Sequence, residues 1–391
     1  MTVTEIARRA KENSPLLQSL SEVKRTQALH TLGDSLVKNT QLILAENAKD
    51  LAAAKTNKLS SAMLDRLTLT EKSIRGLKEM CDSVAAQAQV VGQIVEETTR
   101  PNGLKIQKQR IPIGVIGMIF ESRPNVVVDG AALAIKSGNA IILKGGKEAQ
   151  HSNRVLATII EEATKDILPE GSVSLIETRE DVAELLKLNQ YIDLMVPRGG
   201  SALIDFVRKN ATMPVVAHDK GLCHIYVHKD ADTTKVIPIV LNAKVSRPGV
   251  CNAVETLLIH QAYPEREKVI AALKEAGVEI RSDFETEWLD KIISVKTVKD
   301  EDEAIAHIQK HGSRHTEAIL AKDPKAIEKF MNLLDASAIV INASTRFNDG
   351  GELGLGAELG ISTSKLHAYG PMGAKEMTTT RFIVTGDGQT R

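Results

Sequence analysis

Residues 111–146 read IPIGVIGMIFESRPNVVVDGAALAIKSGNAIILKGG, and this stretch decides the fold class. The continuous apolar run at 111–120 is typical of a fully buried strand. Residues 125–138 are apolar at helical spacing and end at Gly138, which favours a helix that terminates there. The apolar run at 139–146 predicts the next strand. Strand, helix and strand in this order indicate a parallel sheet covered by helices, so the chain belongs to the α/β class.

The same patterns extend in both directions from this stretch. Strands and helices alternate as far as residue 229, with a strand expected at 213–218, and a second α/β series runs from 263 to 345. Residues 95–111 alternate around a Pro-Asn-Gly turn, which predicts a hairpin, and a last strand follows residue 377. The glycine-rich residues 347–377 predict a long loop of the kind that lines active sites. Residues 2–91 predict helices, with N-caps at Thr4, Ser21, Thr40 and Thr70.

The composition is that of an ordinary globular protein. Its 391 residues suffice for two or three domains, and 50 basic against 50 acidic residues leave no net charge that would attract nucleic acid or a membrane. The apolar runs are too short to cross a bilayer, and the charged start argues against a secretory signal. Three scattered cysteines without a CxxC motif fit a reducing compartment, so we expect a cytoplasmic protein.

Residues 244–260, KVSRPGVCNAVETLLIH, contain the first candidate for chemistry. Pro248 and Gly249 predict a tight connection, which would carry Cys251 outside a regular element. Arg247 lies four residues upstream, and a guanidinium over the sulfur would favour the nucleophilic thiolate. A small buried cysteine at the start of a strand explains this stretch equally well.

Two basic, glycine-rich strand ends suggest a nucleotide site. Residues 144–147 (KGGK) and 198–201 (RGGS) each follow a predicted strand, and sites in parallel sheets lie at the carboxyl ends of strands. Glycine at a helix N-cap is the simpler explanation for either one alone. A metal site at His307, His311 and His315 is the less favoured interpretation, because Gly312 should end their helix and no further ligand completes the set. We expect no metal.

Several long stretches resemble the aldehyde dehydrogenase superfamily and, within it, the glutamate-5-semialdehyde dehydrogenase branch. They are IPIGVIGMIFESRPNVVVDGAALAIKSGNAIILKGGKEA, LPEGSV, VPRGGSALI, VSRPGVCNAVETLL and LGISTSKLHAYGPMGAKEMTTTRFIV. The resemblance implies an aldehyde-dehydrogenase-like fold with three parts. These are a Rossmann-like cofactor domain (1–94 and 112–228), a catalytic domain (229–376) and oligomerisation segments (95–111 and 377–391).

The resemblance also implies a reaction. It is the reduction of L-glutamyl 5-phosphate to L-glutamate 5-semialdehyde, a proline precursor, with NADP(H) as cofactor and without a membrane or nucleic acid partner. A homo-oligomer is implied, and a glutamate kinase is a candidate partner because the acyl phosphate is unstable. A CoA-acylating aldehyde dehydrogenase and a catalytically silent nucleotide-binding relative are the alternatives.

Roles for individual residues follow from the same resemblance. Cys251 would be the nucleophile, and Asn125 with the Cys251 backbone N–H would stabilise the oxyanion. His218 lies where hydrolytic relatives have a water-activating Glu, which fits a thioester kept from water; it would bind phosphate or pack. The substrate would contact Arg123, Arg247, Arg346, Lys365 and His367. The cofactor would contact Lys144, Gly200, Ser201 and Glu287.

Overall fold

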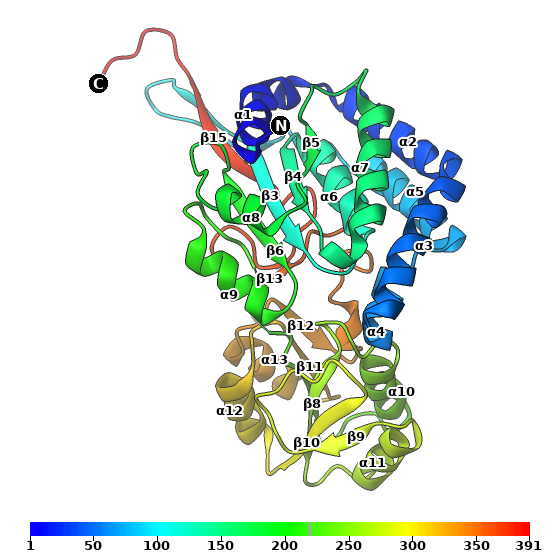
Figure 1. Cartoon of the computed structure of the whole chain (residues 1–391). Coiled ribbons are helices and arrows are strands. Elements are labelled where there is room, and N and C mark those ends of the chain that lie inside the picture. Colours follow the sequence, from blue (N-terminus) through cyan, green and yellow to red (C-terminus); the bar gives the residue numbers. More distant parts are fainter. Residues whose placement is uncertain (218–219) are drawn as a thin grey trace. The chain divides into compact units, whose positions relative to one another are not determined.

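The structure is a computed structural model that describes residues 1–217 and 220–391 and divides into two compact units (Figure 1). The predicted α/β class is confirmed, because each unit is built around its own parallel sheet. The first unit contains residues 1–216, 355–359 and 372–391, and the second contains the described residues of 217–354 and 360–371.

The boundary between the units differs from the expected one at residues 228 and 229. Strand β7 (Cys223–Val227) pairs in parallel with β8 (Val254–His260) and β11 (Thr316–Leu320), so it belongs to the second sheet. The chain therefore enters the second unit at Ala217, before this strand.

The sheet of the first unit has four parallel strands in the order β5-β4-β3-β6. Two crossovers run one way along the sheet and the third returns, so right-handed connections place α6 and α7 on one face and α8 on the other. Figure 1 shows this arrangement of the three helices. The elements are β3 (Val115–Phe120), α6 (Val126–Ser137), β4 (Ala140–Lys144), η1 (Lys147–Ala149), α7 (Gln150–Thr164), β5 (Val173–Leu175), α8 (Arg179–Leu185), β6 (Leu194–Arg198) and α9 (Ser201–Asn210). The strand expected at 213–218 is wrong over its described part, which forms a single bridge between Val215 and Met195.

Five helices precede this sheet, as the periodicity of residues 2–91 predicts. The caps at Ser21 and Thr70 are confirmed, since each side chain accepts a backbone N–H. The caps at Thr4 and Thr40 are wrong: Thr2 caps the first helix, and Thr40 lies inside the third. The helices are α1 (Val3–Ser19), α2 (Glu22–Lys38), α3 (Thr40–Thr56), α4 (Ser61–Leu67) and α5 (Glu71–Ala86).

The sheet of the second unit has six parallel strands in the order β12-β11-β7-β8-β10-β9. The crossover directions place α10 and α11 on one face and α12 and α13 on the other, and each face has its own buried apolar cluster. The sequence interpretation assigned no element to residues 230–243, where the structure has most of α10. This helix contains Pro238 in its interior, and its Val236 and Val240 are buried in the core. The remaining elements are α10 (Thr233–Val245), α11 (Arg266–Glu275), β9 (Glu279–Arg281), β10 (Ile292–Val298), α12 (Glu301–His311), α13 (Pro324–Leu333), β12 (Ala338–Ile341), η2 (Thr345–Phe347), β13 (Ile361–Ser362) and β14 (Gly370–Pro371).

A three-stranded antiparallel sheet completes the first unit. The predicted hairpin is confirmed as β1 (Ile94–Thr99) and β2 (Lys105–Pro112), and the last strand, β15 (Thr378–Thr385), pairs along the whole of β2. The β1 residues are all exposed, as are Phe382 and Val384 on β15.

Candidate active site

Cys251 lies on a tight turn between α10 and β8, as its sequence surroundings predict. The helix ends at Val245 and the strand begins at Val254. Between them, the N–H of Ala253 donates to the carbonyl oxygen of Val250 at 3.0 Å. The turn leaves Cys251 partly exposed at the amino end of its strand.

The other two cysteines are unsuited to nucleophilic attack. Cys81 and Cys223 are buried, and burial raises the pKa of the Cys81 thiol to about 12 and that of Cys223 well above its ordinary value. A buried thiol that stays protonated is a poor nucleophile. The partial exposure of Cys251 therefore favours the chemical interpretation of this cysteine over the packing one.

The segment before β7 presses against the Cys251 backbone. A Cβ atom on Gly221 would lie 2.2 Å from the Cys251 carbonyl oxygen and 2.7 Å from its Cα, so this position must be glycine. The thiol of Cys223 donates to the same carbonyl oxygen at 3.1 Å. Gly221 and Cys223 thus both contact the carbonyl group of Cys251 and hold this peptide in place.

Two guanidinium groups share the electrostatic surroundings of Cys251. Burial lowers the pKa of Arg346, the nearby Asp349 and Cys251 raise it, and Arg247 lowers it further. The structure therefore brings together three residues that the sequence analysis singled out. Such a pair of cations suits an anionic substrate group beside the thiol.

Asn252 ties the segment that carries Arg346 to the cysteine turn. Its amide nitrogen donates to the carbonyl oxygens of Arg346 at 3.3 Å and Asn348 at 2.9 Å. In return, the Thr345 hydroxyl donates to the carbonyl oxygen of Asn252 at 2.7 Å. Asn252 is buried, so these contacts fix the backbone of both segments. Sequence reasoning missed this role, although the residue lies directly beside the cysteine.

Three further predicted residues of the second unit are engaged in local contacts. The Glu287 carboxylate accepts the Gly221 N–H at 2.9 Å. Lys365 lies in the turn between β13 and β14 and pairs with Asp335 at 2.9 Å. His367 lies in the same turn with a φ of 75°, which is uncommon for a residue other than glycine.

The predicted cofactor residues of the first unit lie at carboxyl ends of its strands. Lys144 ends β4, and burial lowers its pKa, with Glu148 opposing and Arg179 adding to that decrease. Gly200 and Ser201 open α9 after β6, and the Gly200 N–H donates to a Glu121 carboxylate oxygen at 2.9 Å. Sequence reasoning missed Glu121, whose carboxylate already accepts one of the free backbone N–H groups at the start of α9.

Asn125 and Arg123 lie just before α6. The Asn125 amide nitrogen donates to Asp129 at 2.8 Å, one helical turn along. Desolvation raises the pKa of Asp129 to about 6, although Arg198, the Asn125 hydrogen bond and Arg123 lower it. Sequence reasoning missed Asp129, but its spacing of four residues from Asn125 on a predicted helix was an available signal.

The remaining predicted residues divide into two groups. His218 lies outside the described residues. The helix of His307 and His311 ends at Gly312 as expected, and the buried His315 instead contacts Cys223 and Thr316. In residues 1–217 and 220–391, no group of three His, Cys, Asp or Glu side chains could hold a metal ion.

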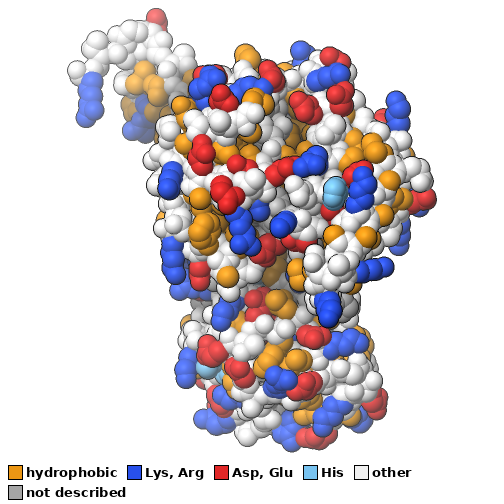
Figure 2. Space-filling view, viewed as in Figure 1, with side chains coloured by type: hydrophobic (Ala, Val, Ile, Leu, Met, Phe, Trp, Pro, Cys, Tyr) orange, Lys and Arg blue, Asp and Glu red, His pale blue; other side chains and the backbone are white. Residues whose placement is uncertain are grey.

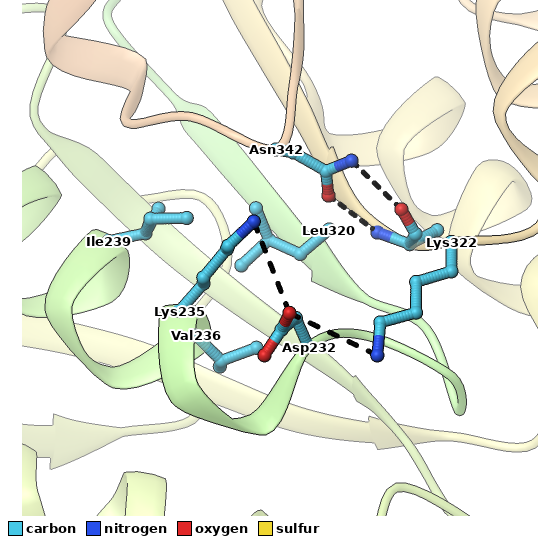
Figure 3. A pocket seen from close by; sticks show the side chains of 8 residues that line it. Asp232, Lys235, Val236, Ile239, Leu320, Lys322 and Asn342 are labelled. Atoms are coloured by element: carbon cyan, nitrogen blue, oxygen red, sulfur yellow. Dashed lines mark hydrogen bonds and ion pairs between the residues drawn. The ribbon is translucent and has the colours of Figure 1, made fainter.

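A small pocket opens at the carboxyl ends of strands in the second sheet, opposite the amino ends where Cys251 lies. Figure 3 shows Asp232 between Lys235 and Lys322, with each ion pair at 4.0 Å, and Asn342 bonded to the neighbouring backbone. The pocket has a volume of about 80 Å³ and lies at the carboxyl ends of β11 and β12, whereas Cys251 precedes β8. It is too small for a nucleotide, and Asp232 neutralises much of its charge.

On the face that Figure 2 shows, acidic and basic side chains are interspersed. Within the described residues, we find no helix long and apolar enough to cross a membrane.

Comparisons with known proteins agree with the fold. The model of the aldehyde dehydrogenase family matches residues 1–288. The gamma-glutamyl phosphate reductase of Carboxydothermus hydrogenoformans is 48% identical, over 100% of this chain and 99% of its own length. That of Aliarcobacter butzleri is 45% identical over 99% of both chains.

Solved structures give the same result. The crystal structure of gamma-glutamyl phosphate reductase from Thermotoga maritima superposes with a TM-score of 0.95, at 39% identity and complete coverage of both chains. An acetylating aldehyde dehydrogenase from Geobacillus thermoglucosidasius reaches 0.76 at 19% identity, over 100% of this chain and 97% of its own, which supports the fold alone. The chain belongs to the aldehyde dehydrogenase family and, within it, to the gamma-glutamyl phosphate reductases.

Proposed function

We propose that this chain reduces L-glutamyl 5-phosphate to L-glutamate 5-semialdehyde and phosphate, with NADPH as reductant and a Cys251 thioester as intermediate. The observation that carries the proposal is the position of Cys251, which is partly exposed on a fixed turn to which Asn252 binds the segment of Arg346. The names of its relatives support this substrate.

The chemistry begins at the sulfur. The Cys251 thiolate attacks the carbonyl carbon of the acyl phosphate, the carbon–oxygen bond to phosphate breaks, and phosphate leaves. Because a mixed anhydride is already activated, this step needs no nucleoside triphosphate. The cofactor supplies the hydride that converts the thioester to the aldehyde and frees Cys251. Asn125 and the Cys251 N–H are the proposed donors to the oxyanion.

The substrate is doubly anionic at its reactive end. Arg247 and Arg346 are the proposed partners of the phosphate near Cys251, since guanidinium groups pair bidentately with it. Arg123 is a further candidate for this group. For the amino acid end, Lys365 and His367 are proposed; the exposed Lys365–Asp335 pair is weak enough to be exchanged for a substrate carboxylate.

The first unit fits a nicotinamide dinucleotide, the cofactor of this family. Gly145, Gly146 and Lys147 follow β4 at the carboxyl end of its strand, where parallel sheets usually bind ligands. Lys144 and Arg179 lie in this region together with the acidic Glu121, Glu148 and Asp181. NADPH is proposed over NADH because the reaction is biosynthetic. Gly200 and Ser201 are proposed to border the nicotinamide half.

The test measures semialdehyde oxidation by NADP⁺, the reverse reaction. Cys251→Ala and Cys251→Ser should abolish turnover while leaving the melting temperature unchanged. The wild-type rate should require phosphate or arsenate, because the acyl group must return to an oxyanion acceptor. Near-normal turnover without Cys251 contradicts the covalent route. An equal rate in phosphate-free buffer contradicts the acyl phosphate, and a rate that requires CoA instead identifies a CoA-acylating enzyme.

We also propose that the chain forms a homo-oligomer through its three-stranded sheet. Ile94 and Val95 on β1, and Phe382 and Val384 on β15, are exposed apolar side chains on the two outer strands. A second copy could cover them. A glutamate kinase remains a candidate partner, because direct transfer would protect the unstable acyl phosphate.

A further inference from the structure

Asp129 differs from the rest of its helix in its contact with solvent. In α6, residues 126–128 and 130–137 are all buried, and Asp129 is only partly buried. It lies one helical turn after Asn125, whose amide nitrogen donates to one oxygen of its carboxylate at 2.8 Å. A charged side chain at the one accessible position of a buried helix indicates a role other than packing in the core.

The Asp129 carboxylate has few partners for a charge that is largely removed from water. In the part of the chain that the structure describes, the Asn125 amide is its one hydrogen-bond donor, and no lysine or arginine forms an ion pair with it. Arg198 contributes positive charge nearby, but its guanidinium donates to the Glu358 carbonyl oxygen at 2.9 Å and pairs with the Glu358 carboxylate at 3.4 Å. Desolvation raises the pKa of Asp129 to about 6, which still leaves the carboxylate ionised at neutral pH. A desolvated carboxylate with one neutral donor is costly, and a bound cation would offset that cost.

The proposed substrate carries such a cation at its amino acid end. L-Glutamyl 5-phosphate has an α-ammonium group, whereas the proposed cationic partners, such as Arg346 and Lys365, suit its phosphate and its carboxylate. An ammonium group has three donors and no acceptor, so a carboxylate is its natural partner. Two methylene groups separate the reacting carbonyl carbon from the carbon that bears the nitrogen, so the nitrogen lies about 4–5 Å from the carbonyl carbon. A carbonyl oxygen bound by Asn125 would therefore bring the ammonium group within reach of Asp129.

We propose that Asp129 binds the α-ammonium group of the substrate and so selects compounds that carry this group over analogues that lack it. The proposal rests on the proposed function, in which Asn125 contacts the reacting carbonyl oxygen. The same contact protects the substrate. A nitrogen held as ammonium has no lone pair, so it cannot attack the acyl phosphate carbon and close a five-membered ring with loss of phosphate.

The test combines two substrates with variants of the protein. L-Glutamate 5-semialdehyde is compared with 5-oxopentanoate, the same molecule without the amino group, in oxidation by NADP⁺ in phosphate buffer. Asp129→Asn keeps the size of the side chain and removes its charge. Asp34→Asn is the matched control, because Asp34 is exposed on α2 and pairs with Lys78. Calorimetry on Cys251→Ala protein, with and without Asp129→Asn, measures the dissociation constant of each compound in the absence of turnover.

We expect Asp129→Asn to lower kcat/KM for the semialdehyde about 10- to 100-fold, mainly through KM, because a charge-assisted hydrogen bond is lost. The change should leave kcat/KM for 5-oxopentanoate close to its wild-type value, and the wild type should prefer the semialdehyde by a factor of the same size. Asn125→Ala should instead lower kcat for both compounds, and Asp34→Asn should match wild type. If Asp129→Asn does not fold, the wild-type preference and the dissociation constants of Cys251→Ala protein for the two compounds decide.

Three results would overturn the proposal. An equal loss with both compounds would make Asp129 a structural partner of Asn125 alone, and unchanged values in Asp129→Asn would leave it without a role in binding. A protein that binds and oxidises the two compounds equally well would not recognise the ammonium group at all. A failure of the proposed function is distinguishable, because it would remove turnover in the wild type, whereas the dissociation constants would still show whether the ammonium group is bound.

Discussion

Replacing Gly221 by alanine tests the contact on which the geometry of the cysteine turn depends. The added Cβ would lie 2.2 Å from the Cys251 carbonyl oxygen and 2.7 Å from its Cα. Both neighbours are backbone atoms, so no side chain can rotate away to relieve the overlap. Because non-bonded carbon and oxygen atoms pack no closer than about 3.2 Å, one segment must move by roughly 1 Å.

The structure sets the size of the expected losses of stability and of turnover. Overpacking of this kind costs about 1–3 kcal/mol of folding free energy. The hydrogen bonds of Cys223 and Glu287 at this contact oppose the movement that would relieve the overlap. A displacement of about 1 Å at a reacting group reduces the rate by about 100-fold. Gly221→Ala should therefore stay folded at 25 °C but lose nearly all turnover.

The assay is semialdehyde oxidation by NADP⁺ in phosphate buffer, read beside thermal unfolding. Gly76→Ala is the matched control: Gly76 lies inside α5 with nothing within 4 Å of an added Cβ, so alanine should be neutral or stabilising there. If Gly221→Ala kept turnover within about threefold of wild type, the close approach would not position Cys251 and the reasoning would fail.

Four further changes test other parts of the structure. Burial raises the pKa of Asp129 from the ordinary 3.8 to about 6 in the folded chain, so the unfolded chain loses this proton first and stability should fall by about 2 kcal/mol between pH 4 and pH 6. Asp129→Asn should remove that fall, and equal pH profiles of the two proteins in urea unfolding would contradict it. Glu255→Gln should lower unfolding free energy by about 3–5 kcal/mol, because the buried Lys244 ammonium loses its partner; an unchanged urea midpoint would refute this. Lys147→Ala should weaken the binding of NADPH more than that of NADH in titrations, and equal weakening would argue against a phosphate contact. Phe382→Asp should reduce the molar mass measured by light scattering, because a charge on β15 would break contacts between copies. An unchanged molar mass would argue against an interface at this sheet.

The sequence was sufficient wherever one local signal decided the structure. The apolar run ending at Phe120 could only be a buried strand, and Pro248 with Gly249 required a turn before the strand that follows Cys251. The hairpin of β1 and β2 followed from the alternation around its turn. In each case, the residues that carry the signal are also the residues that form the element.

The failures occurred where tertiary contacts overrode local preference. Pro238 argues against a helix, but burial of one apolar face in the core of the second unit stabilises α10 despite it. The unit boundary was placed too late because a strand pattern does not reveal which sheet the strand joins. Asp129 could have been found from its spacing to Asn125, whereas the burial that raises its pKa depends on packed neighbours.

The two units place their predicted functional residues by different rules, and this explains why one half was easier to predict. Lys144 lies where parallel sheets usually bind ligands, at the carboxyl end of its strand. Cys251 lies at the amino end of β8, where no general rule predicts a site. Its position depends instead on contacts from segments distant in the chain, with Gly221 on one side and residues 345–348, which bond to Asn252, on the other. A motif can therefore identify the nucleophile, but only the folded chain reveals which residues orient it, so the residues whose substitution should alter Cys251 reactivity most lie outside the cysteine motif.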